Sequence, residues 1–230
     1  MTMTVNELKT ILDVALLKPM ATAAEIEALA GVVRQEGFGQ ICVNTFHVNR
    51  AAAVMRGSTA KVVACVGFPM GAVRTETKVF ETEQALADGA HEIDMVLNLG
   101  AFFGADHGYA EADIRAVVRA AAGAPVKVII ETPFLSHQQK AEAARLAQNA
   151  GAAFVKTCTG FSPDPLALYE DVRLLRQTIG PHMGLKASGR VGNAFRVRSL
   201  LEAGANRFGL ILEQAREILR GWDEADGGAA

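Results

Sequence analysis

The sequence alternates along its whole length between short runs rich in Val, Ile and Phe and longer runs rich in Ala, Glu, Arg and Leu. The short apolar runs are typical of buried parallel strands, and the longer runs place apolar residues at helical spacing. This alternation predicts repeated strand–helix units and leaves few other folds open. The predicted strands are Ile11–Leu17, Gln40–Asn44, Lys61–Phe68, Glu92–Asn98, Lys127–Thr132, Ala153–Thr159, Met183–Ser188 and Arg207–Ile211.

A helix is predicted between each pair of consecutive strands, and one more after the last strand. Gly89, Gly151 and Gly204 each follow a predicted helix and precede a strand. Glycine suits this position because it adopts the left-handed conformation that ends a helix. The predicted helices are Ala23–Glu36, Val48–Arg56, Glu76–Asp88, Ala110–Ala122, Gln138–Ala150, Pro165–Ile179, Ala194–Ala203 and Gln214–Arg220.

Eight units in 230 residues leave about 29 residues for each unit, which is close to the minimum for a strand, a helix and two loops. No linker or low-complexity stretch interrupts the pattern. We therefore predict an α/β protein with one domain, a closed TIM (β/α)8 barrel over residues 1–222, followed by a flexible C-terminal tail over residues 223–230. An open, doubly wound sheet is the second choice, because no Gly-x-Gly-x-x-Gly motif follows the first strand.

The charge balance and the apolar runs exclude several classes of partner. Lys and Arg number 23 against 25 Asp and Glu, so the net charge of −2 lacks the basic excess of proteins that bind nucleic acids or acidic membranes. Apolar runs such as Val62–Phe68 are far shorter than the roughly 20 residues of a membrane span, and the N-terminus does not resemble a signal peptide. We expect a cytoplasmic protein that acts on a small molecule. The assembly that we expect is a homodimer.

Charged side chains near the ends of predicted strands are the candidate catalytic residues. Barrel strands are buried, and active sites lie at their C-terminal ends. Asp13, Asp94, Lys156 and Lys186 occupy such positions, whereas Lys127 opens its strand and is expected at the opposite, structural end. Because Lys156 and Lys186 are 30 positions apart, they fall on neighbouring strands, where their amines could converge.

Two buried lysines and a carboxylate suggest catalysis through an imine. A lysine with the ordinary pKa of about 10.4 is protonated and a poor nucleophile, but burial and a second ammonium both favour the neutral amine. The neutral amine can attack a carbonyl carbon, and Asp94 could orient the second lysine or relay protons. The alternative is a structural salt bridge between Asp94 and one lysine.

The other residues that could carry chemistry have plainer explanations. Cys42, Cys65 and Cys158 are an odd number without Cys-x-x-Cys spacing, so neither a disulfide framework nor a zinc site is predicted. Cys42 and Cys158 are expected as buried small residues, with Cys158 on the same face as Lys156 and so near the pocket. The histidines lack metal-ligand spacing and are expected at the surface or at caps; they are His47, His91, His107, His137 and His182.

Seven segments closely resemble the deoxyribose-phosphate aldolase family, in that family's order. The resemblance extends from about Asp13 to Gly209. The family consists of TIM-barrel class I aldolases that cleave 2-deoxyribose 5-phosphate to glyceraldehyde 3-phosphate and acetaldehyde without a metal or an organic cofactor. The segments are Leu12-Asp-Val-Ala-Leu-Leu-Lys-Pro19, Val66-Gly-Phe-Pro-Met-Gly71, Glu92-Ile-Asp-Met-Val-Leu-Asn-Leu-Gly100, Lys127-Val-Ile-Ile-Glu-Thr132, Phe154-Val-Lys-Thr-Cys-Thr-Gly-Phe161, Glu170-Asp-Val-Arg-Leu-Leu-Arg176 and Gly184-Leu-Lys-Ala-Ser-Gly189.

The resemblance implies a role for each candidate residue. Lys156 would form the Schiff base, Lys186 would lower its pKa, and Asp94 would relay protons. The resemblance also implies that no cofactor and no metal take part. The residues expected to bind substrate are Asp13, Thr157, Thr159, Ser188, Gly189, Arg190 and Gly209.

Three departures from the family pattern concern the substrate. The first strand reads Asp13-Val-Ala-Leu-Leu-Lys where the family usually has Asp-His-Thr-Leu-Leu-Lys, so a hydroxyl is missing. The seventh loop usually carries two adjacent glycines, but here Arg190 follows Gly189. The eighth strand usually ends in a Ser-rich turn that holds phosphate, and here it continues into Leu210-Ile-Leu-Glu213, where apolar side chains and a carboxylate suit an anion poorly.

We therefore predict a deoxyribose-phosphate aldolase-like enzyme with weakened dependence on phosphate. Arg190 could contact a phosphate or a carboxylate in place of the missing glycine amide. One alternative is an aldolase for carboxylated or neutral, non-phosphorylated aldehydes. A non-catalytic sugar-binding barrel is a further alternative, and a metal-dependent aldolase is disfavoured because no set of His and carboxylate residues gathers at the strand ends.

Overall fold

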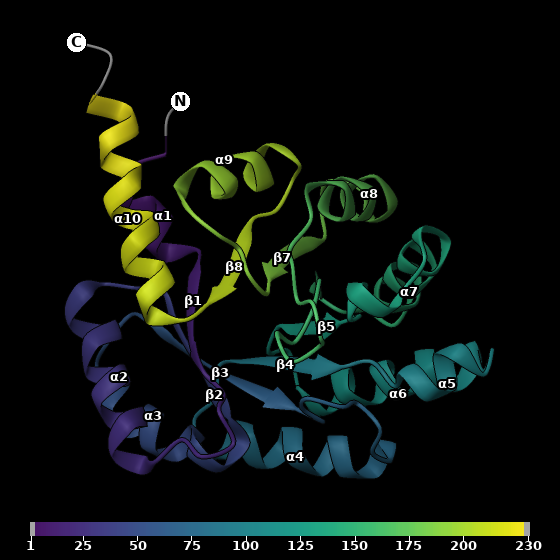
Figure 1. The fold of residues 1–230 in the computed structure, drawn as a ribbon. Coiled ribbons are helices and arrows are strands. Elements are labelled where there is room, and N and C mark those ends of the chain that lie inside the picture. Colours follow the sequence, from purple (N-terminus) through teal and green to yellow (C-terminus); the bar gives the residue numbers. More distant parts are fainter. Residues whose placement is uncertain (1–2, 228–230) are drawn as a thin grey trace.

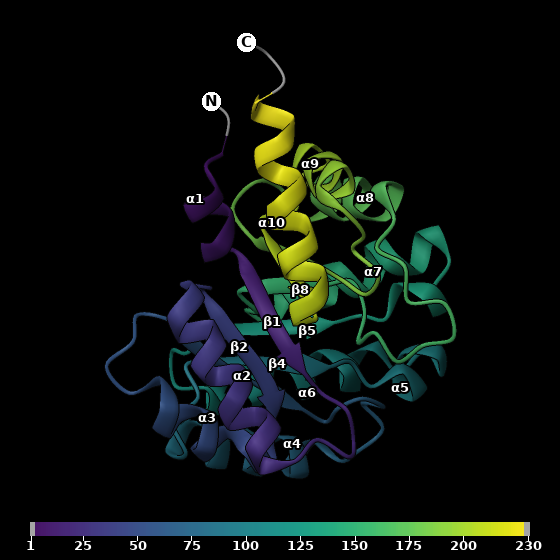
Figure 2. The ribbon, with the colours of Figure 1, turned by 60° about the vertical axis from the view of Figure 1, so that its left-hand side comes forward.

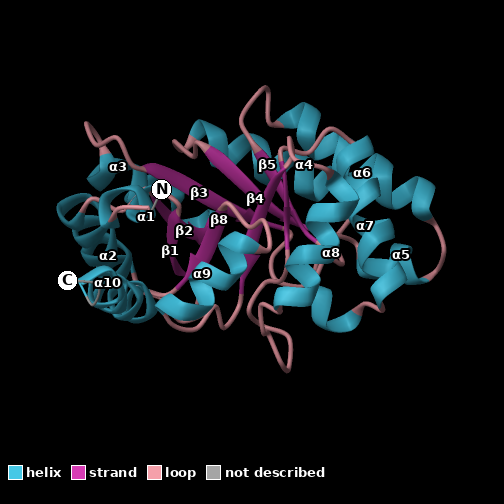
Figure 3. Ribbon diagram, turned by 90° about the horizontal axis from the view of Figure 1, so that it is seen from above, coloured by secondary structure: helices cyan, strands magenta, loops and turns pink. Residues whose placement is uncertain are grey.

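A closed barrel of eight parallel strands forms the centre of the protein, and the helices lie around it (Figures 1 and 3). The computed structural model describes residues 3–227. Each strand pairs with its neighbours in sequence, and the last strand pairs with the first, which confirms the predicted TIM barrel. The strands are β1 (Leu12–Leu16), β2 (Gln40–Asn44), β3 (Lys61–Val66), β4 (Glu92–Val96), β5 (Val126–Ile129), β6 (Phe154–Lys156), β7 (Gly184–Ser188) and β8 (Arg207–Leu210).

The helices follow the predicted order, with two short additions that helical periodicity did not reveal. Helices α1 and α5 have six and five residues, too few for a periodic pattern to appear. The capping box of Thr4 and Glu7 starts α1. The helices are α1 (Val5–Thr10), α2 (Ala23–Glu36), α3 (Val48–Met55), α4 (Thr75–Ala87), α5 (Leu99–Phe103), α6 (His107–Ala120), α7 (His137–Asn149), α8 (Tyr169–Ile179), α9 (Ala194–Glu202) and α10 (Leu212–Gly227).

The two ends of the chain meet beside β1, where α1 lies next to α10 (Figure 2). The indole nitrogen of Trp222 donates a hydrogen bond to the backbone oxygen of Met3 at 2.8 Å, and the Arg198 guanidinium lies 3.8 Å from the ring centroid. Helix α10 therefore continues beyond the predicted end at Arg220. The predicted flexibility of the tail stays a prediction, and residues 228–230 lie outside the described part.

The glycines at the predicted helix ends have the expected conformation. Gly89, Gly151 and Gly204 have φ of +104°, +86° and +109°, values that side chains other than glycine rarely allow. Each one ends a helix and turns the chain back toward the barrel. This confirms the predicted role of the glycines in repeating the strand–helix unit.

The strand register brings charged residues to matching levels inside the barrel. Asp94 on β4 pairs with Lys127 on β5, and Lys156 on β6 pairs with Lys186 on β7. Paired residues of parallel strands point to the same face, and here all four side chains are buried. The apolar core lies mostly between the strands and the helices, so the inside of the barrel is free to hold a polar cluster. Within residues 3–227 we find no helix that combines the length and the apolar character needed to cross a bilayer.

Candidate active site

A cavity of about 270 Å³ opens at the C-terminal ends of the strands. Its walls come from β1, β6, β7 and β8, from the loops that follow them, and from β2. This position agrees with the location of active sites in (β/α)8 barrels. The lining residues are Asp13, Ala15, Leu17, Lys18, Cys42, Lys156, Thr159, Gly160, Phe161, Pro165, Lys186, Ser188, Gly189, Arg190, Gly209, Leu210, Ile211 and Gln214.

The carboxylate of Asp94 connects three buried lysines at the base of this cavity. Its Oδ2 accepts hydrogen bonds from Nζ of Lys156 and from Nζ of Lys186, both at 2.8 Å. Its Oδ1 accepts a hydrogen bond from Nζ of Lys127, also at 2.8 Å. The two lysines and the acid singled out in the sequence therefore converge on one point, as predicted.

The prediction for Lys127 was wrong. Its side chain is fully buried inside the barrel, where Nζ contacts both Asp94 and, at 2.6 Å, Glu92. Lys127 is the register partner of Asp94, so its inward-facing amine lies beside that carboxylate although the residue stands near the start of β5. The position of Lys127 in the sequence did not show that its amine contacts Asp94 and Glu92.

A second carboxylate, Asp13, completes the cluster. Nζ of Lys186 forms a hydrogen-bonded ion pair with Asp13 as well as with Asp94. Nη1 of Arg207 lies 3.2 Å from Asp13 and 3.3 Å from Glu92. Sequence reasoning missed Arg207, which opens β8 as Lys127 nearly opens β5. The buried cluster thus contains three carboxylates and four cations, and every member has an oppositely charged partner.

Gly209 has a structural reason to lack a side chain. A Cβ there would lie 2.8 Å from Oγ of Ser188 and 3.0 Å from Cε of Lys186. Gly209 is also the register partner of Asp13. A larger residue would push Lys186 away from the carboxylate that it reaches in this structure.

The electrostatics of the cluster keep both lysines charged in the unliganded protein. Burial by itself lowers the pKa of Lys156, and nearby Lys186 lowers it further, but Asp94, Cys65 and Cys42 together prevail and the pKa of Lys156 is raised. Burial also acts to lower the pKa of Lys186, but Asp13 and Asp94 hold that pKa well above its ordinary value. The pKa of Asp94 lies well below its usual range despite burial, because Lys127, Lys156 and Lys186 surround it.

These shifts correct one expectation from the sequence. Two neighbouring lysines were predicted to release a neutral amine, and Lys186 does act in that direction on Lys156. The sequence argument underestimated Asp94, 2.8 Å away, whose charge together with Cys65 and Cys42 outweighs burial and Lys186. Neutral Lys156 therefore requires that its contact with Asp94 first be broken or that Asp94 take its proton.

Most of the predicted substrate-binding residues line the cavity, namely Asp13, Thr159, Ser188, Gly189, Arg190 and Gly209. Thr157 does not line it. Its hydroxyl donates to the backbone oxygen of Ser188 at 3.0 Å and accepts from the backbone nitrogen of Ser188 at 2.9 Å, so it joins β7 to the end of β6. Cys158 is likewise outside the lining and donates to the same oxygen. Burial raises the pKa of the Cys158 thiol to about 11.

The distal end of the cavity, by which we mean the part near Arg190, Leu210 and Ile211, differs in composition from its base. Arg190 and Asp164 form an ion pair whose side chains are 60% and 75% exposed. Leu210 and Ile211 add apolar surface at the end of β8. Ala15, in place of the family's threonine, also lines the cavity and offers no hydroxyl.

Two polar lining residues were missed by sequence reasoning. Lys18 lies two residues after the end of β1, in the quoted segment that ends at Pro19, and Gln214 lies in the first turn of α10. Lys18 is exposed at the cavity edge. The family-like segment around Lys18 was the available signal, whereas Gln214 lies beyond the region of resemblance.

Glu131 is another functional candidate that the sequence argument passed over. It follows β5 in the left-handed conformation, with φ of +57°, which is unusual for a residue with a side chain. Its buried carboxylate accepts hydrogen bonds from the backbone nitrogen of Thr159 at 3.1 and 3.3 Å. Burial raises the pKa of Glu131. The residue holds the loop after β6, which carries cavity-lining residues.

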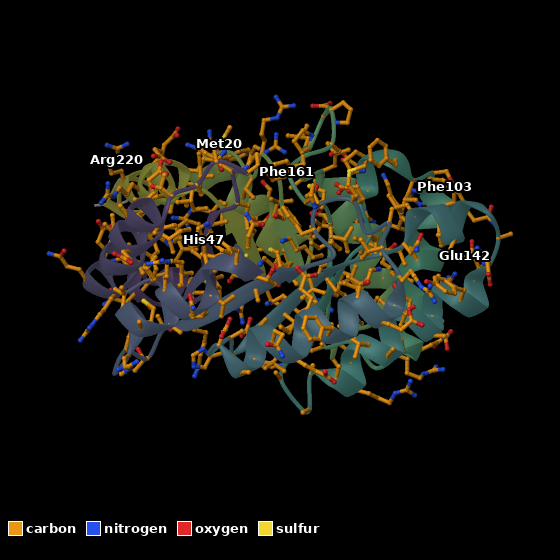
Figure 4. All side chains as sticks on the ribbon, turned by 90° about the horizontal axis from the view of Figure 1, so that it is seen from below. Met20, His47, Phe103, Glu142, Phe161 and Arg220 are labelled. Atoms are coloured by element: carbon orange, nitrogen blue, oxygen red, sulfur yellow. The ribbon has the colours of Figure 1, made fainter. Side chains whose placement is uncertain are left out.

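Cys42 and Cys158 are buried, as expected, and Cys42 also makes a contact with Cys65 that the sequence did not show. Cys42 lines the cavity, and its Sγ lies 3.5 Å from Sγ of Cys65 on the neighbouring strand. The contact lowers the pKa of Cys42 and raises that of Cys65. His47, labelled in Figure 4, is the N-cap residue of α3, one of the positions expected for the histidines, and it is buried, with Nε2 3.1 Å from the backbone oxygen of Ala21.

The chain is similar to known aldolases over most of its length. Residues 12–209 match the model of the family described as DeoC/LacD family aldolase. A deoxyribose-phosphate aldolase of Aciduliprofundum boonei is 46% identical over 209 residues, which is 90% of this chain and 94% of that relative. A Bacillus licheniformis protein, deoxyribose-phosphate aldolase 1, is 48% identical over 205 residues, 89% of this chain and 92% of that protein.

Solved structures extend the comparison to the fold. The tetrameric deoxyribose phosphate aldolase from Aeropyrum pernix superposes with a TM-score of 0.87 and 26% identity, covering 96% of this chain and 93% of that chain. The family match, the shared fold and the lysine–carboxylate cluster agree with the resemblance noted from the sequence. The chain therefore belongs to the DeoC/LacD aldolase family.

Proposed function

We propose that this protein is a class I aldolase that cleaves 2-deoxyribose 5-phosphate to glyceraldehyde 3-phosphate and acetaldehyde through an imine on Lys156. The observation that carries the proposal is the single carboxylate oxygen, Asp94 Oδ2, that lies 2.8 Å from both lysine nitrogens at the base of the cavity. Nearly half of the sequence is shared with aldolases that bear this substrate in their name.

The contacts favour Lys156 as the nucleophile. Lys156 contacts one carboxylate, Asp94, whereas Lys186 contacts two, Asp13 and Asp94. The pKa of Lys186 is accordingly held further above its ordinary value than that of Lys156. Lys156 is the amine that can be freed at smaller cost, and Lys186 stays as the fixed positive charge beside it.

The proposed reaction begins when the aldehyde of the open-chain sugar displaces the ammonium of Lys156 from Asp94. As it leaves, Lys156 gives its proton to Asp94, because burial and Lys186 both favour the neutral amine, and the amine attacks the carbonyl carbon. Asp94 returns the proton to the carbinolamine hydroxyl, which leaves as water and gives the iminium ion. Asp94 or a water that it holds takes the proton of the C3 hydroxyl, the C2–C3 bond breaks, and its electron pair moves toward the iminium nitrogen as an enamine. Protonation of C2 and hydrolysis release acetaldehyde and free Lys156.

The distal end supports weakened dependence on phosphate. Arg190 and Lys18 are the cations of the cavity edge, and Arg190 is already paired with Asp164. Leu210 and Ile211 present carbon where a phosphate needs donors. A carboxylated or neutral aldehyde is therefore the alternative substrate class, and it would use the same imine chemistry.

Borohydride trapping and a substrate panel test the proposal. Incubation with acetaldehyde and borohydride should add one covalent ethyl group at Lys156, detected by peptide mass analysis. The cleavage of 2-deoxyribose 5-phosphate should exceed that of 2-deoxyribose by about tenfold, which is the lower end of the loss expected for one missing charge-assisted contact. Absence of trapping together with sugar binding would support the non-catalytic alternative. A preference for the phosphate ester by several orders of magnitude would contradict the weakened phosphate dependence.

We also infer a cytoplasmic location and assembly into a homodimer. The location rests on the apolar runs of the sequence given, which are too short to span a membrane. A tetramer is described for the Aeropyrum pernix relative, so light scattering of the purified protein should distinguish a dimer from a tetramer.

A further inference from the structure

Cys42 and Cys65 form a pair of thiols at the base of the active-site cavity that the proposed reaction does not use. Cys42 lies on β2 and Cys65 on β3, and both side chains point into the barrel. Their sulfur atoms are 3.5 Å apart. The sulfurs and one carboxylate oxygen of Asp94 all lie within 4.8 Å of one another.

We propose that Cys42, Cys65 and Asp94 form an inhibitory site for a thiophilic divalent cation of the Zn²⁺ and Cd²⁺ class. This inference goes beyond the proposed function, because the cation is an inhibitor and takes no part in the aldol chemistry. The ligand set of two sulfurs and one carboxylate oxygen matches the donors that zinc accepts in proteins.

The sulfur separation favours a bridging metal over a disulfide. Zinc–sulfur bonds of about 2.3 Å at a tetrahedral angle hold two sulfurs about 3.8 Å apart. The observed 3.5 Å requires an opening of only about 0.3 Å, which side-chain rotation can supply. A disulfide needs a sulfur separation of about 2.05 Å, and both cysteines are free thiols in this structure.

Replacement of the two thiol protons by one divalent ion also leaves the charge of the barrel centre unchanged. Binding breaks two S–H bonds, forms two metal–sulfur bonds and releases two protons, so a 2+ ion replaces two positive charges. The net charge beside Asp94 and its three lysines is therefore unchanged. Without the metal, two thiolates in the same place would add two negative charges to a buried site.

The structure provides both a path to the site and a reason for inhibition. Cys42 lines the cavity, so an ion can enter by the route that the substrate takes. Asp94 is the carboxylate that holds Lys156 and Lys186. An ion coordinated by the Asp94 carboxylate weakens the contacts of Asp94 with both lysines and prevents Asp94 from transferring protons. Turnover should therefore fall as the site fills.

Cd²⁺ is the probe for the experiment, because its bonds to thiolates give an ultraviolet charge-transfer absorbance. The full-length protein, reduced beforehand, should show this absorbance at one ion per chain and release two protons per ion. Cys42→Ser and Cys65→Ser should each weaken Cd²⁺ binding by at least about 100-fold, since the loss of even an outer-shell partner costs about 10- to 100-fold. Cys158→Ser is the matched control and should keep the absorbance, because Cys158 contacts Ser188 on another side of the barrel.

Inhibition by Cd²⁺ is then measured for each variant relative to its own rate without the ion. The wild type should lose activity as the absorbance rises, and a dithiol chelator should restore the activity. Cys65→Ser should keep its activity at the same Cd²⁺ concentrations. An absorbance that persists in both serine variants would overturn the proposal, and so would tight Cd²⁺ binding by the wild type without thiolate absorbance or no binding at all. The absorbance and the proton release do not depend on aldolase activity, so their failure is distinct from a failure of the proposed function. Proton release by the wild type also tests the site if a serine variant does not fold.

Discussion

The base and the distal end of the active-site cavity are built in opposite ways. At the base, Asp94, Lys156 and Lys186 are buried and joined by ion pairs: Asp94 contacts lysines on three other strands, Lys186 contacts two carboxylates, and Lys156 contacts Asp94. At the distal end, Arg190 and Asp164 form one exposed ion pair on loops. A buried network fixes its members because removal of one leaves the others without a partner, whereas an exposed pair can be replaced at little cost. The chemistry of this enzyme is therefore fixed by the barrel, and the choice of substrate is left to its loops.

The largest effect should follow from Lys156→Ala. Without the amine no imine can form, so turnover should fall by at least about 10⁴-fold and borohydride trapping should vanish. The measurement is the steady-state rate together with intact mass after trapping. If Lys156→Ala is still trapped, another residue is the nucleophile, and the role given to the base of the cavity is wrong.

Lys186→Ala is the matched control for this change. Because Lys186 lowers the pKa of Lys156, its removal should raise that pKa further. Trapping at Lys156 should then persist but require more alkaline solution, and turnover should recover in part as the pH rises. Lys186→Arg should rescue incompletely, because a guanidinium does not exchange protons as an ammonium does. Normal turnover of Lys186→Ala at neutral pH would contradict the role assigned to this lysine.

Asp94→Asn should separate imine formation from turnover. Loss of the carboxylate removes the attraction that raises the pKa of Lys156 and leaves burial and Lys186, which lower it. Trapping should extend to lower pH than in the wild type, while turnover should fall by about 10²- to 10⁴-fold because proton transfer is lost. The pH profiles of trapping and of kcat test this directly. A trapping profile that moves to higher pH would show that Asp94 does not control the charge of Lys156.

Lys127→Met should show how strongly the base of the cavity depends on complete pairing. Asp94 and Glu92 each lose one buried ammonium but keep another cation, so the expected loss of stability is about 3 kcal/mol, the low end for a broken buried pair. For a chain of this length Tm should fall by about 6–12 °C. Thermal unfolding followed by circular dichroism is the measurement. Arg190→Ala should change Tm by only about 2–4 °C at most, since its ion pair is exposed. Equal shifts for the two variants would remove the contrast between the regions.

Arg190→Ala should have the smallest effect on catalysis, and only for anionic substrates. If Arg190 leaves Asp164 to contact a phosphate, its loss costs about 1.5–3 kcal/mol, or roughly ten- to a hundredfold in kcat/KM for 2-deoxyribose 5-phosphate. Self-condensation of acetaldehyde should barely change. Asp164→Asn is the matched variant and should improve kcat/KM for the phosphate ester, because it frees Arg190. An equal loss for charged and neutral substrates would indicate a distorted loop instead.

The local pattern of the sequence was enough to predict the barrel, its strand order and the main catalytic candidates. Strand and helix alternation is a short-range property, and a charged residue in an apolar strand is visible without any tertiary contact, as for Lys156 and Lys186. Short elements such as α5 escaped because five residues carry no clear period. The boundary of α10 was missed because its stability comes from packing beside the N-terminal segment through Trp222.

Only the tertiary structure decided which charges meet. Lys127 and Arg207 stand near the starts of their strands, yet their long side chains reach Glu92, and each also reaches a carboxylate beside Lys186. The pKa of Lys156 depends on Asp94, which is 62 positions earlier in the chain and 2.8 Å away, and this carboxylate together with Cys65 and Cys42 reverses the direction expected from burial. Sequence determines which side chains are available and which face of a strand they occupy. The closure of the barrel sets their separations, and electrostatic energies follow those separations.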